Sequence, residues 1–237
     1  MSSKIYQLPA IGKVTITKRR ANRNIRLSIG HDGDIKVSIP VYAPYISGLN
    51  FVSAKSNWIL ANRPMKTILQ DGQMIAGTYL LTLIESDVPK PSSRIGDNTI
   101  TVKYPARQSI LHHSIQTCAS RACIRAIRHQ AEIHLPSRIY ELSQKYSIPY
   151  SQLSIKHLSR RWGSCDQTKR IVLNLYLIQL PEELIDYVIL HELSHTKVLN
   201  HSAQFWQYLS EMDPQAKQHR RQLHNYHPGI IPVFGVS

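Results

Sequence analysis

The residues best placed to do chemistry lie in the segment VILHELSHTKVLNHSAQFW, which spans residues 188–206. It holds three histidines and one glutamate, namely His191, Glu192, His195 and His201. Residues four apart on a helix share one face, so the rings of His191 and His195 would project side by side. Two imidazoles in this arrangement can bind one Zn²⁺ at roughly 2.0–2.1 Å each. The spacing therefore predicts a metal site with two of the three protein ligands that a catalytic zinc usually has.

Glu192 is the candidate catalytic residue of this motif. It directly follows the first histidine, so its side chain would project about 100° further around the helix. This places the carboxylate beside the metal and not on it, where it can accept a proton from a zinc-activated water. The sequence H-E-x-x-H thus predicts a general base next to a zinc ion.

The third ligand is expected where the motif helix ends. The helix would open at Pro181, where the missing N–H does no harm, and the apolar run LIDYVIL would bury it. It would stop near Asn200, which can adopt the left-handed conformation, and Ser202 is a good N-cap for the next helix. His201 then lies in a tight turn between two helices and can fold back to complete a three-histidine site.

Other interpretations of these residues remain open. The histidines could lie on the surface of a helix, the third of them capping the helix that follows. The metal could instead be structural, in which case four Cys or His ligands are usual and Cys165 is the candidate fourth ligand. Glu211, in the following helix, is a rival to His201 as third ligand.

Residues 1–105 are predicted to be rich in strands. VTITKRR alternates, and NIRLSIGHDGDIKVSIP contains two alternating runs joined across Asp32-Gly33, which indicates a hairpin. ISGLNFVSAKSNWILANRP has helical spacing, whereas MIAGTYLLTLIES and NTITVKYP are typical of strands. The intervening DVPKPSSRIGDN is rich in Pro, Ser and Gly and predicts an exposed loop.

A long helix is predicted for residues 107–145, with Pro136 expected to kink or split it. Its apolar side consists of Ile110, Ile115, Ala119, Ala122, Ile127, Ala131 and Leu135. After it, SIKHLS and RIVLNLYLI are predicted strands, and RRWGSCDQTK between them is expected to be partly extended and partly turn.

The charge of the chain is strongly positive, at +14, with an isoelectric point near 9.8. Lys and Arg outnumber Asp and Glu by 14 to 6 before Arg107 and by 15 to 9 from there on, so the excess is not confined to a tail. Such a field attracts polyanions, which makes nucleic acid a candidate partner through a basic surface.

The remaining composition bears on fold and compartment. Hydrophobic residues make up 42%, enough for a core, which excludes gross disorder. No run approaches the roughly 18–20 apolar residues that span a bilayer, and the first residues lack the apolar centre of a secretory signal. The three cysteines, Cys118, Cys123 and Cys165, are too few for a disulfide scaffold. We therefore expect a cytoplasmic protein without a membrane partner.

The segment RRWGSC, followed by RIVLNLYLIQLPEELIDYVILHELSHTKVLNHSAQFW, resembles the YgjP-like metallopeptidases, a family related to the SprT-like zincins. RNIRLSIGHDGDIKVSIP and FVSAKSNWI extend the resemblance over most of the chain. It implies His191, His195 and His201 as zinc ligands and Glu192 as the catalytic acid and base. The histidine spacing also equals that of the metzincins, but their turn glycine would fall at Val198, which disfavours that assignment.

The resemblance also implies an architecture. We expect an α+β fold in which a strand-rich region, residues 1–105, precedes a zincin-like metallopeptidase domain, residues 106–237, with a small sheet and the motif helix. By analogy with zincins, whose cleft is often bordered by an extended segment, Trp162, Ser164 and Cys165 would line the site. A second oxyanion donor is left open, with Arg160, Arg161, Tyr226 and His227 as candidates.

Two classes of function follow. The first is a zinc-dependent metallopeptidase that hydrolyses peptide bonds with a zinc-activated water and Glu192 as general base. The second is a basic nucleic-acid-associated module whose zinc is structural. Glu192 favours the first class, because a structural zinc site has no need of a base beside its first ligand.

Overall fold

The computed structural model describes the whole chain apart from residues 1, 10, 31–33, 63–67, 231 and 234–237. The chain forms two compact units, residues 1–67 and residues 68–237, each with a hydrophobic core of its own. The division thus falls at residue 67 and not at residue 105, where the sequence pattern changes. The reason is that strands from residues 73–105 pack on the long helix that follows them and share its core. The expected α+β class is confirmed.

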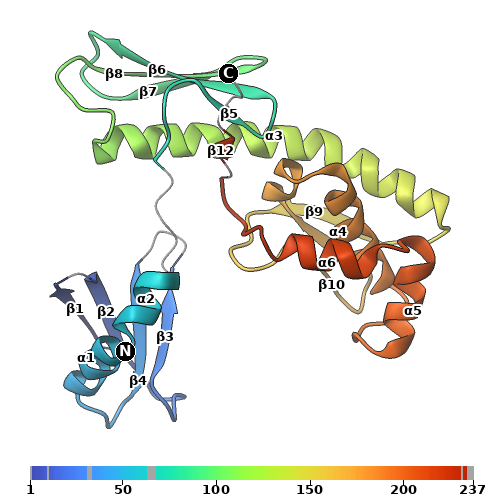
Figure 1. Cartoon of the computed structure of the whole chain (residues 1–237), viewed down its shortest axis with the longest axis horizontal. Coiled ribbons are helices and arrows are strands. Elements are labelled where there is room, and N and C mark those ends of the chain that lie inside the picture. Colours follow the sequence, from blue (N-terminus) through green and yellow to red (C-terminus); the bar gives the residue numbers. More distant parts are fainter. Residues whose placement is uncertain (1, 10, 31–33, 63–67, 231, 234–237) are drawn as a thin grey trace. The chain divides into compact units, whose positions relative to one another are not determined.

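Unit 1, residues 1–67, has a four-stranded sheet and two helices (Figure 1). Its strands are β1 (Ser3–Leu8), β2 (Gly12–Arg19), β3 (Arg26–Ile29) and β4 (Ile35–Pro40), in the order β1-β2-β4-β3. Strands β3 and β4 pair antiparallel, which confirms the expected hairpin, although residues 31–33 of its turn lie outside the described residues. The expected helical segment is two helices, α1 (Tyr45–Ala54) and α2 (Ser56–Asn62), separated at Lys55.

Unit 2 begins with a five-stranded sheet. Its strands are β5 (Gln73–Ile75), β6 (Tyr79–Ser86), β7 (Ser92–Ile95), β8 (Thr99–Pro105) and β12 (Pro232–Val233), in the order β12-β5-β6-β8-β7. The single strand predicted for residues 74–86 is two strands, because Ala76 and Gly77 take positive φ angles of 52° and 66° and turn the chain back. The loop predicted for residues 87–98 contains β7, which pairs with β8; its exposed and half-buried side chains give no apolar alternation.

Helix α3 (His113–Lys145) runs along this sheet and on towards the C-terminal helices (Figure 1). Most of the predicted apolar side is confirmed, since Ile115, Ala119, Ala122, Ile127, Ala131 and Leu135 are all buried. The helix begins at His113 and not near residue 107, so Ile110 lies before it and is half-buried. Of the two outcomes expected at Pro136, a kink or a split, the split does not occur, because the helix continues through this residue. Proline at this position leaves only the carbonyl of Glu132 without its helical donor, and Glu132 is exposed, so water can satisfy that carbonyl.

A second, three-stranded sheet leads to the candidate site. It consists of β9 (Gln152–Lys156), β10 (Gly163–Cys165) and β11 (Arg170–Asn174), in the order β10-β11-β9. The predicted strand 170–178 stops at Asn174, because the side chain of this buried residue accepts a hydrogen bond from the Tyr176 N–H and starts a short 3-10 helix, η1 (Leu175–Gln179). The same amide donates to the carbonyls of Leu158 and Arg161, which fixes the loop before β10.

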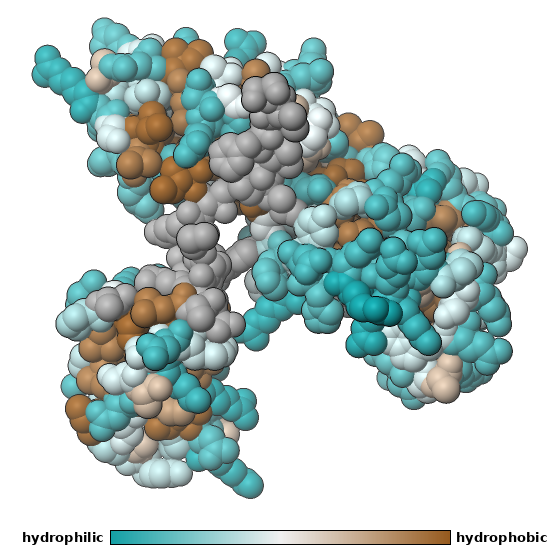
Figure 2. Space-filling model, in the orientation of Figure 1, coloured by the Kyte–Doolittle hydropathy of each residue, from teal (hydrophilic) through white to brown (hydrophobic). Residues whose placement is uncertain are grey.

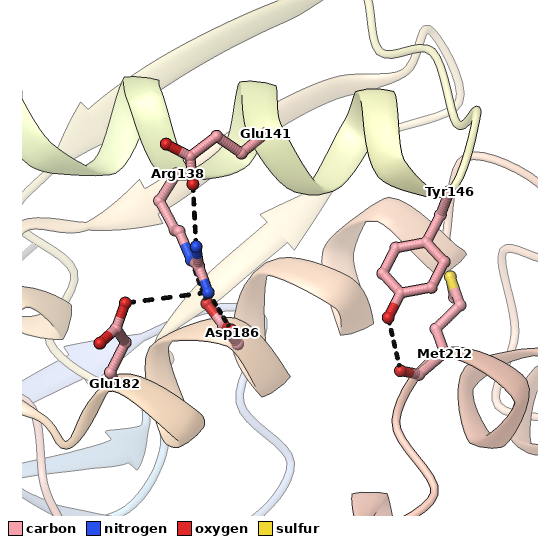
Figure 3. Close-up of polar contacts among 6 residues, drawn as sticks. All are labelled: Arg138, Glu141, Tyr146, Glu182, Asp186 and Met212. Atoms are coloured by element: carbon pink, nitrogen blue, oxygen red, sulfur yellow. Dashed lines mark hydrogen bonds and ion pairs between the residues drawn. The ribbon is translucent and has the colours of Figure 1, made fainter.

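Three helices complete the unit, namely α4 (Glu182–Ser194), α5 (Ala203–Met212) and α6 (Ala216–Leu223). Helix α3 is tied to α4 by Arg138, which donates two hydrogen bonds of 2.6 Å to the Asp186 carboxylate and one of 2.8 Å to Glu141 (Figure 3). The end of α5 is fixed to the end of α3 as well, because the Tyr146 hydroxyl donates to the Met212 carbonyl.

Hydrophilic side chains cover the visible surface over α6 (Figure 2). Within the described residues, no helix is both long and apolar enough to cross a membrane.

Candidate metal centre

Helix α4 carries the H-E-x-x-H motif on a rigid support. Pro181 precedes its first turn and two glutamates lie at its positive end, which favours the helix start. Its buried apolar side chains are Leu184, Ile185, Tyr187, Val188, Ile189, Leu190 and Leu193. His191 lies in the last turn, and His195 is the residue just after it, still in helical conformation. Both rings therefore lie on one face, as the spacing predicts, with centroids 4.9 Å apart.

The chain turns out of α4 by a route other than the predicted one. Asn200 does not take a positive φ angle; instead its side chain accepts a hydrogen bond from the Ser202 N–H. The turn is stabilised from within, because the Val198 N–H donates to the Ser194 carbonyl and the Val198 carbonyl lies 3.0 Å from His195 Nδ1. A carbonyl can only accept a hydrogen bond, so Nδ1 of His195 carries the proton. The Nε2 atom then has a lone pair with which it can bind a metal.

The three predicted histidines converge. One ring nitrogen from each of His191, His195 and His201 lies within 4.8 Å of the other two. The Nε2 atoms of His191 and His201 are 3.0 Å apart, and the ring centroids of His195 and His201 are 4.7 Å apart. Cys165 and Glu211, the alternative ligands, are not part of this group, and no other group of this kind occurs in the described part of the chain.

The histidine cluster is chemically suited to a metal ion. Burial, with smaller contributions from the neighbouring His195 and His201, lowers the pKa of His191 to about 3, so the ring is neutral. Burial also lowers the pKa of His201. A histidine that binds a metal must be neutral, and two Nε2 atoms that face each other at 3.0 Å are well placed to share a cation. Three imidazole nitrogens are a donor set that fits Zn²⁺ and leaves a coordination position open.

An aromatic wall that sequence reasoning did not assign holds the three rings in place. Phe205 of α5 is fully buried, and its ring lies 4.9, 4.6 and 4.8 Å from the rings of His191, His195 and His201, centroid to centroid. It stacks on His195 at an interplanar angle of 28°. The adjacent Trp206 stacks on the outer ring, His201, at 5.9 Å. The sequence signal was the dipeptide FW four residues after the third histidine.

Glu192 lies buried beside the cluster and is not one of the converging groups. Its Oε2 atom is buried and has no hydrogen-bond partner among the described residues. Burial raises its pKa to about 8, and the positive charge of Arg161 opposes that rise. The backbone of Gly163 lies against it, since a Cβ added there would be 2.7 Å from both Cγ and Oε1 of Glu192. The sequence pattern does not indicate this role for Gly163, although the glycine lies within RRWGSC.

The predicted cleft residues, Trp162, Ser164 and Cys165, are all half-buried and lie in or next to β10. Among the described strands, β10 pairs with β11 alone, so it forms an edge of its sheet. Burial raises the pKa of Cys165 to about 11, and the negative charge of Glu192 contributes, which places the thiol near the carboxylate. Trp162 also packs against the core, so the ring has a structural role. Of the suggested oxyanion donors, Arg161 acts on Glu192, whereas Tyr226 packs against the core.

The chain belongs to the YgjP-like metallopeptidase family, since the model of the YgjP-like metallopeptidase domain matches residues 23–226. The protein is thus a metallopeptidase, a hydrolase. A solved structure, the metallopeptidase zymogen of Pyrococcus abyssi abylysin, is 20% identical over 41% of this chain and 99% of that chain, with a TM-score of 0.36. The zymogen of Methanocaldococcus jannaschii jannalysin is 26% identical over 38% and 94%, with a TM-score of 0.35. No curated protein matches the chain.

Proposed function

We propose that the protein is a zinc-dependent peptidase whose metal is held by His191, His195 and His201 and whose general base is Glu192. The observation that carries this proposal is the convergence of three histidine ring nitrogens beside a buried carboxylate oxygen that has no partner among the described residues. A purely structural zinc would have no use for that carboxylate. The alternative of a basic module with a structural zinc is therefore not favoured.

Each residue of the proposed site has a separate role in peptide hydrolysis. His191, His195 and His201 would hold the Zn²⁺ ion, which would supply Lewis acidity to a peptide carbonyl and to a water molecule. Glu192 would accept a proton from water at Oε2, the atom without a partner among the described residues, and would pass it to the leaving amine nitrogen. The Val198 carbonyl fixes the tautomer of His195, so that its Nε2 keeps the lone pair that would bind the metal.

Strand β10 is the proposed binding surface for the substrate backbone. As an edge strand it has unpaired backbone groups on its outer side, and an extended peptide can pair with them. Gly163, in this strand, lies against Glu192, so a peptide paired there passes close to the base. Trp162, Ser164 and Cys165 would then line the cleft on either side of the peptide bond to be cleaved.

Zinc content and activity in three variants test the proposal. Elemental analysis after dialysis is expected to find one zinc per chain in the wild type and in Glu192→Gln, and little in His201→Ala. A control, His129→Ala, removes an exposed histidine of α3 and should keep its zinc. Cleavage of a quenched fluorescent peptide library should fall by about 10²–10⁴-fold in Glu192→Gln, since it loses the general base. Zinc retained in His201→Ala would contradict the ligand set.

Activity equal to wild type in Glu192→Gln would contradict the role of the base, whatever the zinc content. A zinc-containing wild type that cleaves no member of the library would favour the structural module instead. The cytoplasmic location stays a prediction from the sparse cysteines.

A further inference from the structure

The positive charge of the chain is divided unequally between its two compact units. Residues 1–67 contain 11 lysines and arginines and only two acidic residues, a net charge of +9, so the rest of the chain carries +5 of the total of +14. The two acidic residues, Asp32 and Asp34, both lie in the connection between β3 and β4. The basic character is therefore concentrated in a unit that contains none of the metal-binding residues.

One face of the unit 1 sheet is covered by its helices. The side chains of Val14 and Ile16 in β2, and of Val37 in β4, point into a core that also contains Val52 of α1 and Ile59 of α2. Helix α1 comes so close that a Cβ added at Gly48 would lie 3.1 Å from Ile16. Both helices therefore lie on the same side of the sheet.

The opposite face is open and cationic. Successive side chains of a strand point to opposite faces, so residues that alternate with the buried ones lie on the other side. Four of these are the exposed cations Lys13, Arg19, Arg26 and Lys36. Thr15, Thr17, Ser28 and Ser38 lie between them, and the register places Thr15 beside Lys36 and Ser38 beside Arg26. None of the four cations forms an ion pair with another described residue.

The connection between β2 and β3 extends this face. Arg20 and Arg23 are exposed there, next to Arg19 and Arg26 at the same end of the sheet. Tyr42, which is 81% exposed, lies against this connection, because its hydroxyl donates to the Arg23 carbonyl at 3.5 Å. An exposed aromatic ring beside a group of arginines is the combination on which an unpaired base can stack.

We propose that this open face of unit 1 binds the phosphate backbone of a single-stranded nucleic acid. Lys and Arg neutralise phosphates, and the threonine and serine hydroxyls between them are further donors to phosphate oxygens. An anionic membrane fits the face less well. Membrane-binding surfaces insert several apolar side chains into the bilayer, whereas the exposed aliphatic side chain on this face is that of Ile5. The proposal concerns a second site and does not depend on the metal centre.

Binding is tested on the full chain with a fluorescently labelled single-stranded oligonucleotide of about 20 nucleotides, long enough to cover a small sheet face. Fluorescence anisotropy is measured over a range of salt concentrations. The variant carries Lys13→Gln, Arg26→Gln and Lys36→Gln together. If three phosphate contacts are lost, the slope of log affinity against log salt should fall by about 2, and affinity should fall at least about tenfold near 0.1 M salt.

A charge-matched control places the same three neutral substitutions elsewhere. Lys55→Gln lies after α1, whereas Lys103→Gln and Arg121→Gln lie in unit 2, and all three residues are exposed. This control should change affinity by no more than about twofold and leave the salt slope unchanged. A second triple variant, with Lys13→Arg, Arg26→Lys and Lys36→Arg, keeps the charges and should bind as the wild type does.

Three outcomes would overturn the proposal. The first is no binding of the oligonucleotide by the wild type, and the second is an equal loss in the open-face variant and the charge-matched control. The third is selective loss of binding to phosphatidylserine vesicles or to an acidic polypeptide, with oligonucleotide binding unaffected. Peptidase activity measured on the same variants separates this site from the metal centre, since unchanged activity is expected in all of them.

Discussion

The backbone of Gly163 lies directly against the side chain of Glu192, and a methyl group added at this glycine would be 2.7 Å from both Cγ and Oε1 of the glutamate. No side chain other than that of glycine leaves room for this contact. The close packing of strand β10 against the proposed base therefore depends on the absence of a Cβ atom at residue 163. Glu192 is itself buried, so an added methyl group would act on a side chain inside the protein.

The first prediction is that Gly163→Ala displaces Glu192 and lowers kcat. A shift of about 1 Å in a catalytic group can cost about 10²-fold in rate, and we expect a loss of that order. Zinc content should stay at the wild-type value, because the three histidines are not in this contact. Kinetics and elemental analysis of the same preparation check both statements.

Gly96→Ala is the matched control for this substitution. A Cβ added there would also come within 3.0 Å of a neighbour, at 2.9 Å from Thr99 Oγ1, but in the turn between β7 and β8. It should keep wild-type activity. Equal activity in Gly163→Ala and wild type would mean that the position of Glu192 is not critical.

The second prediction concerns Arg138, which ties α3 to the motif helix. Its two hydrogen bonds to Asp186 are 2.6 Å long, and both side chains are only about one quarter exposed, at 26% and 24%. The Asp186 carboxylate raises the pKa of Arg138, as expected of a tight pair. Arg138→Met leaves that carboxylate half-buried without its partner, so the free energy of unfolding should fall by about 1–3 kcal/mol in urea denaturation.

Arg128→Met gives the comparison for Arg138. Its contact with Glu132 is 3.6 Å long and lies on an exposed face of the same helix. Exposed pairs of this spacing contribute roughly 0.3–0.5 kcal/mol, so the loss should be small. If the two variants lost equal stability, the Arg138–Asp186 pair would contribute no more to the free energy of unfolding than an exposed ion pair.

The third prediction concerns the aromatic wall. Phe205→Leu keeps most of the buried volume but removes the ring that stacks on His195, so the protein should remain folded. The histidine rings lose their lateral support, and we expect zinc affinity to fall by about tenfold, the lower end of the range for residues that orient ligands. Competition with a chromogenic zinc chelator measures this. Unchanged affinity, with a normal circular dichroism spectrum, would show that the turn alone positions the rings.

The sequence predicts that the three histidines converge, because the pattern that places them is local. His191 and His195 are related by helix geometry alone, and His201 follows a helix end that the sequence indicates. The contact between Gly163 and Glu192 is not local, since these residues lie on different elements and a glycine has no side chain to signal a role. Phe205 was overlooked for a related reason, because an aromatic residue in an amphipathic helix is first of all a core residue.

The fold shows the same limit. Periodicity predicts α3 and most strands, but it fails at β7, where four polar or half-buried residues are held by pairing with β8. It also places the domain boundary at residue 105 and not at residue 67, because a change from strands to helix need not be a change of core. The open cationic face of unit 1 becomes visible only when β2, β3 and β4 are paired in register.

The last prediction concerns the thiol of Cys165. Only a thiolate reacts with iodoacetamide, and burial raises the pKa of this thiol to about 11. Labelling of the folded protein near pH 8 should therefore be slow and should rise about tenfold per pH unit, because the thiolate fraction does so below the pKa. In urea, where the pKa returns to about 8.5, labelling near pH 8 should be about 10²-fold faster, as measured by peptide mass spectrometry. Rapid labelling of the folded protein at neutral pH would mean that a cation stabilises the thiolate, and would restore Cys165 as a candidate ligand.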